Sequence, residues 1–378
     1  MPKIRVLIVD DSTVVRRFLS DAISKDPELE VVGTASNGAI ALQKIVQLNP
    51  QVVTMDIEMP EMSGLEALAM LKRSHIALPV IMVSSLTERG AAATLEALSL
   101  GAADYVTKPS SMHAPGDEEK QAFLGDLLPK LKALGAPKPA VGSVRPALPT
   151  GPRPAGRAPA AFEPPRPGVA QVARRAGRID VVAIGVSTGG PNALAELIPA
   201  LPADFPIPIV IVQHMPPIFT KLLADRLRAK AAIAVKEGAS GDPVTAGVAF
   251  IAPGGHHMVV TAGDTVHIAT NLEAPENSCR PAVDVLFRSV SDVYGPAVLA
   301  VVMTGMGQDG LRGCELVRER GGQVLVQDEK TSVVWGMPGF VADAGLADEV
   351  LPLEQLAAAI VRRARVGRVA AQSAAGRR

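Results

Sequence analysis

The sequence predicts an α/β protein of two domains. The N-terminal domain is expected to be doubly wound around a five-stranded parallel sheet, and the C-terminal domain to combine a mostly parallel sheet with an antiparallel hairpin. Short aliphatic runs alternate with amphipathic segments in both halves, which is typical of βα units. Hydrophobic residues make up 48% of the 378 residues and aromatic residues only 3%, as in buried parallel strands covered by helices. A Pro/Ala/Arg-rich segment divides the two halves.

The first domain is expected to span residues 1–135. Its five aliphatic runs have the length of buried strands, and five strands in this length of chain suit a small doubly wound fold. The predicted strands are Ile4–Val9, Val31–Ala35, Val52–Met55, Val80–Val83 and Asp104–Thr107.

Composition changes abruptly over residues 136–178, where Lys and Arg are frequent and Glu163 is the one acid. Such a segment buries too little apolar surface to offset its ordering entropy, so we expect an extended basic linker. The second domain is expected over residues 179–366, with a hairpin between Gly247 and Ala269 and a closing helix over 353–366. Residues 367–378 are expected to be a disordered tail.

Bulk properties exclude several classes of protein. The formal net charge is zero, which argues against a whole-protein electrostatic grip on nucleic acid or on an acidic membrane. Cys279 and Cys314 cannot build a disulfide framework and lack zinc ligands at short spacing. The N-terminal apolar run ends in acids, unlike a signal peptide, and no run is long enough to span a bilayer. We therefore expect a cytoplasmic monomer that neither binds nucleic acid nor inserts into a membrane.

Carboxylates follow two predicted strands of the first domain. Asp10 and Asp11 follow the first strand and Asp56 follows the third, and carboxyl ends of parallel strands meet at one sheet edge. Mg²⁺ is the fitting partner for such a cluster. Ser84 and Lys108, after the fourth and fifth strands, add a hydroxyl and an ammonium that suit phosphoryl transfer to a carboxylate. An Asp after a single strand is often only a helix N-cap. Helix capping does not as easily explain acids, a hydroxyl and a lysine at four strand ends.

The motifs V-D-D-S, M-D-I-E-M-P-E-M-S-G, V-S-S and Y-V-T-K-P resemble the response-regulator receiver family, which has a flavodoxin-like fold. The resemblance implies that Asp56 is the phosphoacceptor. It also implies that Asp10, Asp11, Asp56 and the Glu58 backbone carbonyl surround Mg²⁺, and that Ser84 and Lys108 contact the phosphoryl group. Tyr105 is either a switch aromatic or a half-buried strand residue.

The second domain opens with V-V-A-I-G-V-S-T-G-G-P, in which Ser187 lies between a predicted strand and a predicted helix that begins near Pro191. Glycines here permit close approach of a substrate, and free N–H groups at the turn can stabilise an anion. A serine nucleophile fits this position. A nucleotide phosphate site is a fair competitor, because Gly-rich turns also cradle phosphates.

The second domain has four histidines that could act as the general base. His214 ends the aliphatic run I-V-I-V-Q-H, which brings it to the sheet edge of Ser187. His256, His257 and His267 are interpreted as loop or strand-face residues.

The cluster V-V-M-T-G-M-G-Q-D-G offers Asp309 as the acid that orients the imidazole, in a Ser, His, Asp order. Asp284 and Asp292 are rivals, although Asp284 is interpreted as a surface residue of its own predicted helix, 281–294. Met306 can present a backbone N–H to an oxyanion. A helix-capping loop is the alternative reading of this segment.

Six motifs together resemble the chemotaxis protein-glutamate methylesterase family: G-V-S-T-G-G, V-Q-H-M-P-P, I-A-P-G-G-H-H-M, R-P-A-V-D-V-L-F, T-G-M-G-Q-D-G and V-W-G-M-P-G. The resemblance implies a triad of Ser187, His214 and Asp309, with Met306 in the oxyanion hole and Thr188 supporting the site. It implies hydrolysis of glutamate γ-methyl esters on chemoreceptors, deamidation of glutamines, and a chemotaxis histidine kinase as phosphodonor. No cofactor is expected for the esterase reaction.

Two rival functions stay open from the sequence. One is a signalling adaptor whose second domain binds a nucleotide or a partner through its Gly-rich turns. The other is a DNA-binding output domain. The sequence gives it little support, because basic charge is concentrated in the linker and no helix-turn-helix pattern stands out.

Overall fold

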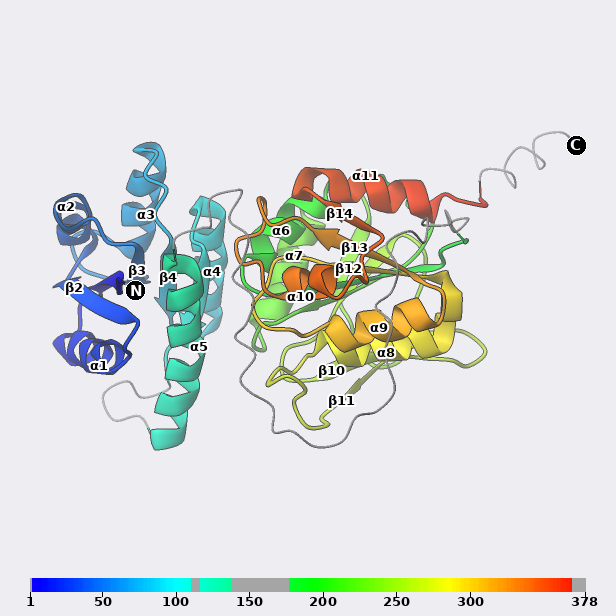
Figure 1. Ribbon diagram of the computed structural model, residues 1–378, viewed down its shortest axis with the longest axis horizontal. Coiled ribbons are helices and arrows are strands. Elements are labelled where there is room, and N and C mark those ends of the chain that lie inside the picture. Colours follow the sequence, from blue (N-terminus) through cyan, green and yellow to red (C-terminus); the bar gives the residue numbers. More distant parts are fainter. Residues whose placement is uncertain (1, 110–115, 137–176, 369–378) are drawn as a thin grey trace, which may run out of the picture. The chain divides into compact units, whose positions relative to one another are not determined.

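The computed structural model describes residues 2–109, 116–136 and 177–368 (Figure 1). Most of the linker predicted over 136–178 and of the tail predicted over 367–378 therefore lies outside the described residues. Among the described residues, no helix is both long enough and apolar enough to cross a bilayer.

The N-terminal domain is a five-stranded parallel sheet in the order β2-β1-β3-β4-β5, as the sequence predicted. Its strands begin and end within two residues of the predicted runs. They are β1 (Ile4–Val9), β2 (Leu29–Ala35), β3 (Val52–Asp56), β4 (Val80–Ser84) and β5 (Asp104–Thr107).

Helices cover both faces of this sheet because alternate strand residues point to opposite sides. Val6 and Ile8 pack with α1 (Thr13–Ser24) and α5 (Asp117–Gly135). Leu7 and Val9 belong to the core under the other three helices. Those helices are α2 (Gly38–Leu48), α3 (Gly64–Arg73) and α4 (Glu88–Leu100).

The C-terminal domain contains a seven-stranded parallel sheet in the order β14-β13-β12-β6-β7-β9-β8. Its central strands are almost wholly aliphatic and buried. The strands are β6 (Val181–Val186), β7 (Ile209–Gln213), β8 (Ala234–Glu237), β9 (Val248–Ile251), β12 (Val298–Val302), β13 (Gln323–Gln327) and β14 (Glu349–Leu351).

The antiparallel hairpin predicted between residues 247 and 269 is only partly as expected. β10 (His257–Thr261) and β11 (His267–Asn271) do form an antiparallel pair. The run V-A-F-I, in contrast, is β9 and runs parallel between β7 and β8 in the large sheet. It is buried on both faces, which the short length of the run did not indicate.

The large sheet also carries helices on both faces (Figure 1). Val182 and Ile184 of β6 pack toward α6 (Gly190–Leu197), α7 (Phe219–Arg228) and α11 (Leu353–Ala364). Val181 and Ala183 pack toward the opposite layer. The helices of that layer are α8 (Val283–Tyr294), α9 (Leu311–Glu319) and α10 (Met337–Asp343). Because β12, β6 and β7 are neighbours, the segments that follow them meet at one edge.

Candidate functional site

Three charged side chains meet at the carboxyl edge of the N-terminal sheet. Asp10 follows β1, Asp56 ends β3 and Lys108 follows β5. The Lys108 ammonium lies 3.0 Å from the Asp10 carboxylate and 2.7 Å from the Asp56 carboxylate. Both carboxylates are buried, so a single cation bridges two acids that would otherwise repel each other.

Burial is the main influence on Asp56, and it raises the pKa of that carboxyl to about 6 against the opposing effect of Lys108. Asp11 is exposed, but its carboxylate lies within 4.8 Å of the oxygens of Asp10 and Asp56. These three oxygen donors fit a hard divalent cation such as Mg²⁺, which takes few carboxylates and keeps several waters.

Ser84 and Glu58, the other two residues expected at this edge, have side chains that bond to residues other than Asp56. The Ser84 hydroxyl is buried and donates to the carbonyl of Gly90, 3.1 Å away, at the start of α4. The side chain of Glu58 is exposed and pairs with Arg89 at 3.3 Å. Within the described residues, neither side chain forms a hydrogen bond or ion pair with Asp56.

Ser187 directly follows β6 and lies in a tight turn that leads into α6. Its N–H donates to the carbonyl of Thr304, and its own carbonyl accepts from the N–H of Gly190 and from Nε2 of Gln213. Gly189 adopts a φ of +78°, which favours glycine. A Cβ on Gly190 would lie 2.0 Å from Oε1 of Gln213, so glycine is also required there for space.

The segment after β12 packs closely against Ser187. A Cβ on Gly305 would lie 2.9 Å from the Cβ of Ser187, and the Thr304 hydroxyl donates to the carbonyl of the buried Thr188 at 2.8 Å. Among the described residues, the Met306 N–H has no hydrogen-bond acceptor. The Met306 N–H thus belongs to the segment that packs on Ser187, and an unpaired backbone donor near a nucleophile can stabilise an oxyanion.

His214 follows β7, the strand next to β6, and its N–H donates to the carbonyl of Val186. Its Nε2 lies 2.8 Å from Oδ2 of Asp309, and its Nδ1 lies 3.6 Å from Sγ of Cys279. In the part of the chain that the structure describes, Ser187 and His214 share no side-chain hydrogen bond. With Asp309 accepting the Nε2 proton, Nδ1 is the nitrogen that is left to act as a base.

Asp309 is buried and accepts four hydrogen bonds. Oδ2 accepts from the Val283 N–H at 2.7 Å besides His214, and Oδ1 accepts from the Asp284 N–H and from Nδ2 of Asn277. Val283 and Asp284 open α8, so the carboxylate also faces the positive end of a helix. This environment fixes the carboxylate and favours its charged form.

The pKa values of the pair move in opposite directions. Burial alone would lower the pKa of His214, but its hydrogen bonds to Asp309 and Cys279 raise that pKa to about 10. Burial would raise the pKa of Asp309, whereas the contact with His214 and the α8 N–H donors hold it below its usual value. The site therefore stabilises an imidazolium, which is the state that a base reaches after taking a proton.

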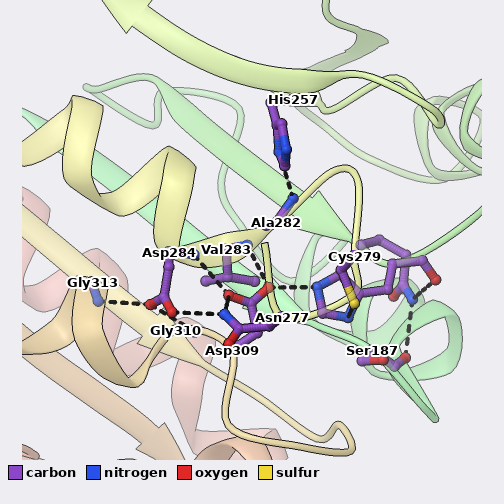
Figure 2. Close-up of polar contacts among 12 residues, drawn as sticks. Ser187, His257, Asn277, Cys279, Ala282, Val283, Asp284, Asp309, Gly310 and Gly313 are labelled. Carbon is purple, nitrogen blue, oxygen red and sulfur yellow. Dashed lines mark hydrogen bonds and ion pairs between the residues drawn. The ribbon is translucent and has the colours of Figure 1, made fainter. Parts of the chain in front are cut away.

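The interpretation of Asp284 as a surface residue is wrong. Asp284 is buried, and its Oδ1 accepts from the N–H groups of Gly310 and Gly313, which begin α9. Its Oδ2 accepts from Asn277. Figure 2 shows these contacts running from Gly313 and Asp284 to Asp309. The hydrophobic periodicity of α8 does not show whether a residue in its first turn, such as Asp284, is buried or exposed.

Sequence reasoning also missed Asn277 and Cys279. Both come from a tight turn at residues 276–279, in which Glu276 and Cys279 exchange two backbone hydrogen bonds. Asn277 and Ser278 have φ values of 52° and 62°. Cys279 has no zinc-ligand neighbours at short spacing in the sequence, but the fold brings His214 and Asp309 to it.

The other three histidines of the second domain lie in a loop or in the strands β10 and β11. His257 accepts a hydrogen bond from the Ala282 N–H (Figure 2). Its Nε2 also lies 3.0 Å from the Ala274 carbonyl. His256 and His267 contact nearby loop atoms of Gly254 and Thr265. Their described contacts hold backbone segments in place.

The geometry defines a class of protein: a receiver domain joined to an α/β domain with a strand-end Ser, His and Asp. A family profile described as CheB methylesterase matches residues 182–360, and the response regulator receiver domain profile matches residues 6–114.

Curated relatives match almost the whole chain. A "protein-glutamate methylesterase/protein-glutamine glutaminase" of Trichodesmium erythraeum is 51% identical over 96% of this chain and 99% of its own length. One of the same name from Nocardioides sp. is 48% identical over 96% of both chains. The crystal structure of the Thermotoga maritima CheB methylesterase catalytic domain is 42% identical, covers 49% of this chain and 99% of that chain, and has a TM-score of 0.48. The chain belongs to the protein-glutamate methylesterase/protein-glutamine glutaminase family.

Proposed function

We propose that this protein is a phosphorylation-activated esterase that hydrolyses glutamate γ-methyl esters on chemoreceptors and deamidates receptor glutamines. The observation that supports it best is the meeting of three segments at one sheet edge. Ser187 lies in the turn after β6, the His214–Asp309 pair follows β7 and β12, and the unpaired Met306 N–H belongs to the segment that packs on Ser187. The names of the relatives support the choice of substrate.

In the proposed mechanism, Nδ1 of His214 takes the proton of the Ser187 hydroxyl as Oγ attacks the ester carbonyl. Asp309 keeps the Nε2 proton and stabilises the imidazolium. The Met306 N–H donates to the developing oxyanion, and Thr188 supports the turn. Methanol leaves with the proton from His214, and water then hydrolyses the acyl-enzyme to free glutamate and serine. With a glutamine side chain the leaving group is ammonia.

The reaction needs a small movement from the described conformation. Nδ1 faces Cys279 rather than Ser187, so the side chain of Ser187 or His214 must shift before the proton can pass. Catalytic hydrogen bonds often tighten only when substrate binds.

In the receiver domain, Asp56 is the proposed acceptor of a phosphoryl group from a chemotaxis histidine kinase. Asp10, Asp11, Asp56 and the Glu58 carbonyl would hold Mg²⁺, which neutralises charge on the phosphoryl oxygens when bound. Lys108 would then move its contact from the Asp56 carboxylate to the phosphoryl group, and Ser84 would turn from Gly90 toward it. The new charge shifts the receiver toward a state that permits catalysis.

The proposed functional units are a receiver domain over residues 1–135 and a catalytic domain over residues 179–366. The protein acts as a cytoplasmic monomer without nucleic acid, and the esterase reaction uses no cofactor.

Methanol release from methylated receptor membranes tests the function. The wild type is expected to release methanol faster with a small-molecule phosphodonor, Ser187→Ala to release none above background, and Asp56→Asn to lose the response to the phosphodonor. A serine-directed fluorophosphonate should label the wild type but not Ser187→Ala. Full activity of Ser187→Ala, or no labelling of the wild type, would favour a binding adaptor instead.

A further inference from the structure

Beside the proposed catalytic base lies a thiol that the mechanism does not use. Cys279 Sγ is 3.6 Å from Nδ1 of His214 and is half-buried, while 13% of the His214 side chain is exposed. Among the described residues, His214, Cys279 and Asp309 form one of the two groups whose ligand atoms lie close enough to hold a metal ion. The other is the carboxylate cluster of the receiver domain.

We propose that Cys279 and His214 form a binding site for Zn²⁺ that reversibly blocks the catalytic base. Thiolate and imidazole together select zinc and similar borderline-soft ions, whereas the all-oxygen cluster at Asp56 suits Mg²⁺. The two sites therefore differ in the chemistry of the ion that each takes.

The separation of the two donor atoms fits a tetrahedral ion. Zinc lies about 2.3 Å from a thiolate and about 2.0 Å from an imidazole nitrogen, so a tetrahedral angle places the two donors about 3.5 Å apart. Sγ and Nδ1 are 3.6 Å apart, which matches this separation. Water is expected at the other two positions of the ion.

Both donors are held in place by their surroundings. His214 contacts the Asp309 carboxylate through its other ring nitrogen, the second contact that zinc-bound histidines usually make. The backbone of Cys279 is held by two hydrogen bonds with Glu276, which in turn pairs with Arg288 at 2.6 Å. Binding therefore needs little rearrangement of either side chain.

The binding step is balanced by proton release. The Cys279 thiol and a protonated Nδ1 each give a proton to solvent as the Zn–S and Zn–N bonds form, so zinc affinity rises with pH. Once Nδ1 donates its lone pair to zinc, it cannot take the Ser187 proton. The inhibition part of this proposal rests on the proposed esterase function, whereas the binding part does not.

Spectroscopy with Co²⁺, a coloured substitute for zinc, tests binding in the full-length protein. Excess Mg²⁺ keeps the receiver carboxylates occupied. The wild type is expected to gain one equivalent of a thiolate-to-cobalt charge-transfer band that Zn²⁺ abolishes. The band should be absent from Cys279→Ala and Cys279→Ser and present in Cys314→Ala, a matched control because Cys314 is buried in α9. No band in the folded wild type, or a band in Cys279→Ala, would overturn the proposal.

Methanol release with increasing free Zn²⁺ tests inhibition. Each protein is compared with its own zinc-free rate. Zinc should inhibit the wild type and Cys314→Ala, and a chelator should restore the rate. Cys279→Ala should need more than about tenfold higher zinc for the same inhibition. Equal sensitivity of Cys279→Ala would refute the inhibitory role. A cobalt band in a protein without esterase activity would leave the metal site standing and would count against the proposed function alone.

Discussion

Asp309 and Asp284 cap each other's helices. Each carboxylate accepts hydrogen bonds from N–H groups at the start of the helix to which the other aspartate belongs or leads. Asp309, just before α9, accepts the first N–H groups of α8, and Asp284, in the first turn of α8, accepts N–H groups at the start of α9. Asn277 donates to both carboxylates. The N-termini of α8 and α9 thus stabilise two buried carboxylates. Asp309 contacts His214, and Asp284 helps to position Asp309.

Asp284→Ala is expected to destabilise the protein and to slow the esterase. Loss of the carboxylate leaves the buried Gly310 and Gly313 N–H groups without acceptors, which should lower the free energy of unfolding by at least about 2 kcal/mol. The loop that carries Asp309 should then loosen, and kcat should fall. Urea unfolding and methanol release measure the two effects.

Asp292→Ala is the matched control for this change. Asp292 lies in the same helix, but its side chain is 56% exposed in an ion pair with Arg320. Its removal should change the free energy of unfolding by less than about 0.5 kcal/mol. Wild-type stability and rate in Asp284→Ala would show that the shared capping has no influence on the site.

The pKa of His214 makes the esterase rate depend on pH. Hydrogen bonds to Asp309 and Cys279 outweigh burial and raise that pKa to about 10, so almost all of the base is protonated at neutral pH. The rate of the unphosphorylated enzyme should rise with pH well above the ordinary His value of 6.5. Cys279→Ala should move the rise to lower pH because one stabilising contact of the imidazolium is lost. An unchanged profile in Cys279→Ala would rule out this contact as a cause.

The same residue links stability to pH. The folded protein binds the His214 proton more tightly than the unfolded chain does, because its pKa is raised from 6.5 to about 10. The contribution of His214 to stability is therefore complete below pH 6.5 and is lost as the pH rises toward 10. Removal of the histidine in His214→Ala should flatten this part of the stability profile in urea titrations. An equally steep profile in that variant would assign the pH dependence to another group.

The fold was predictable where its signals are local. Long aliphatic runs such as Ile4–Val9 mark buried parallel strands, and Ser187 and His214 could be nominated because each directly follows such a run. The edge strands β8 and β14 give no such signal, since they are short and contain charged residues that are typical of loops. The short run of β9 resembles the hairpin strands that follow it, and no local signal marks its parallel pairing with β7 and β8.

The surroundings of the site could not be predicted in the same way. Cys279 lies 65 residues from His214 in the sequence, and Asn277 lies 32 residues from Asp309. A turn with two non-glycine residues at positive φ carries both side chains, and no motif marks it. The packing of that turn on the sheet edge decides which groups touch the triad, and packing is a property of the whole domain.

Gly305→Ala is expected to damage the site without a change in its polar groups. The new Cβ would lie 2.4 Å from Sδ of Met337 and 2.9 Å from Cβ of Ser187, so the turn must move away from the serine. Displacement of the Met306 N–H should lower kcat about tenfold or more. Gly263→Ala is the control, since its Cβ would lie 3.4 Å from the nearest atom, a carbonyl of the β10–β11 loop. Similar kcat values for both variants would place the oxyanion donor elsewhere.

Phosphorylation of the receiver should fail at low pH, because burial raises the pKa of Asp56 to about 6 even with Lys108 beside it. A neutral carboxyl neither attacks a phosphodonor nor binds Mg²⁺, so the rate of phosphorylation should fall as the pH drops through about 6. Lys108→Ala removes the ammonium that lies 2.7 Å from the carboxylate and should shift this midpoint upward. The exposed Lys25→Ala should leave it unchanged. Carboxyl NMR titration of Asp56 measures the midpoint directly, and a midpoint that stays put in Lys108→Ala would mean that the ion pair does not control the charge of the phosphoacceptor.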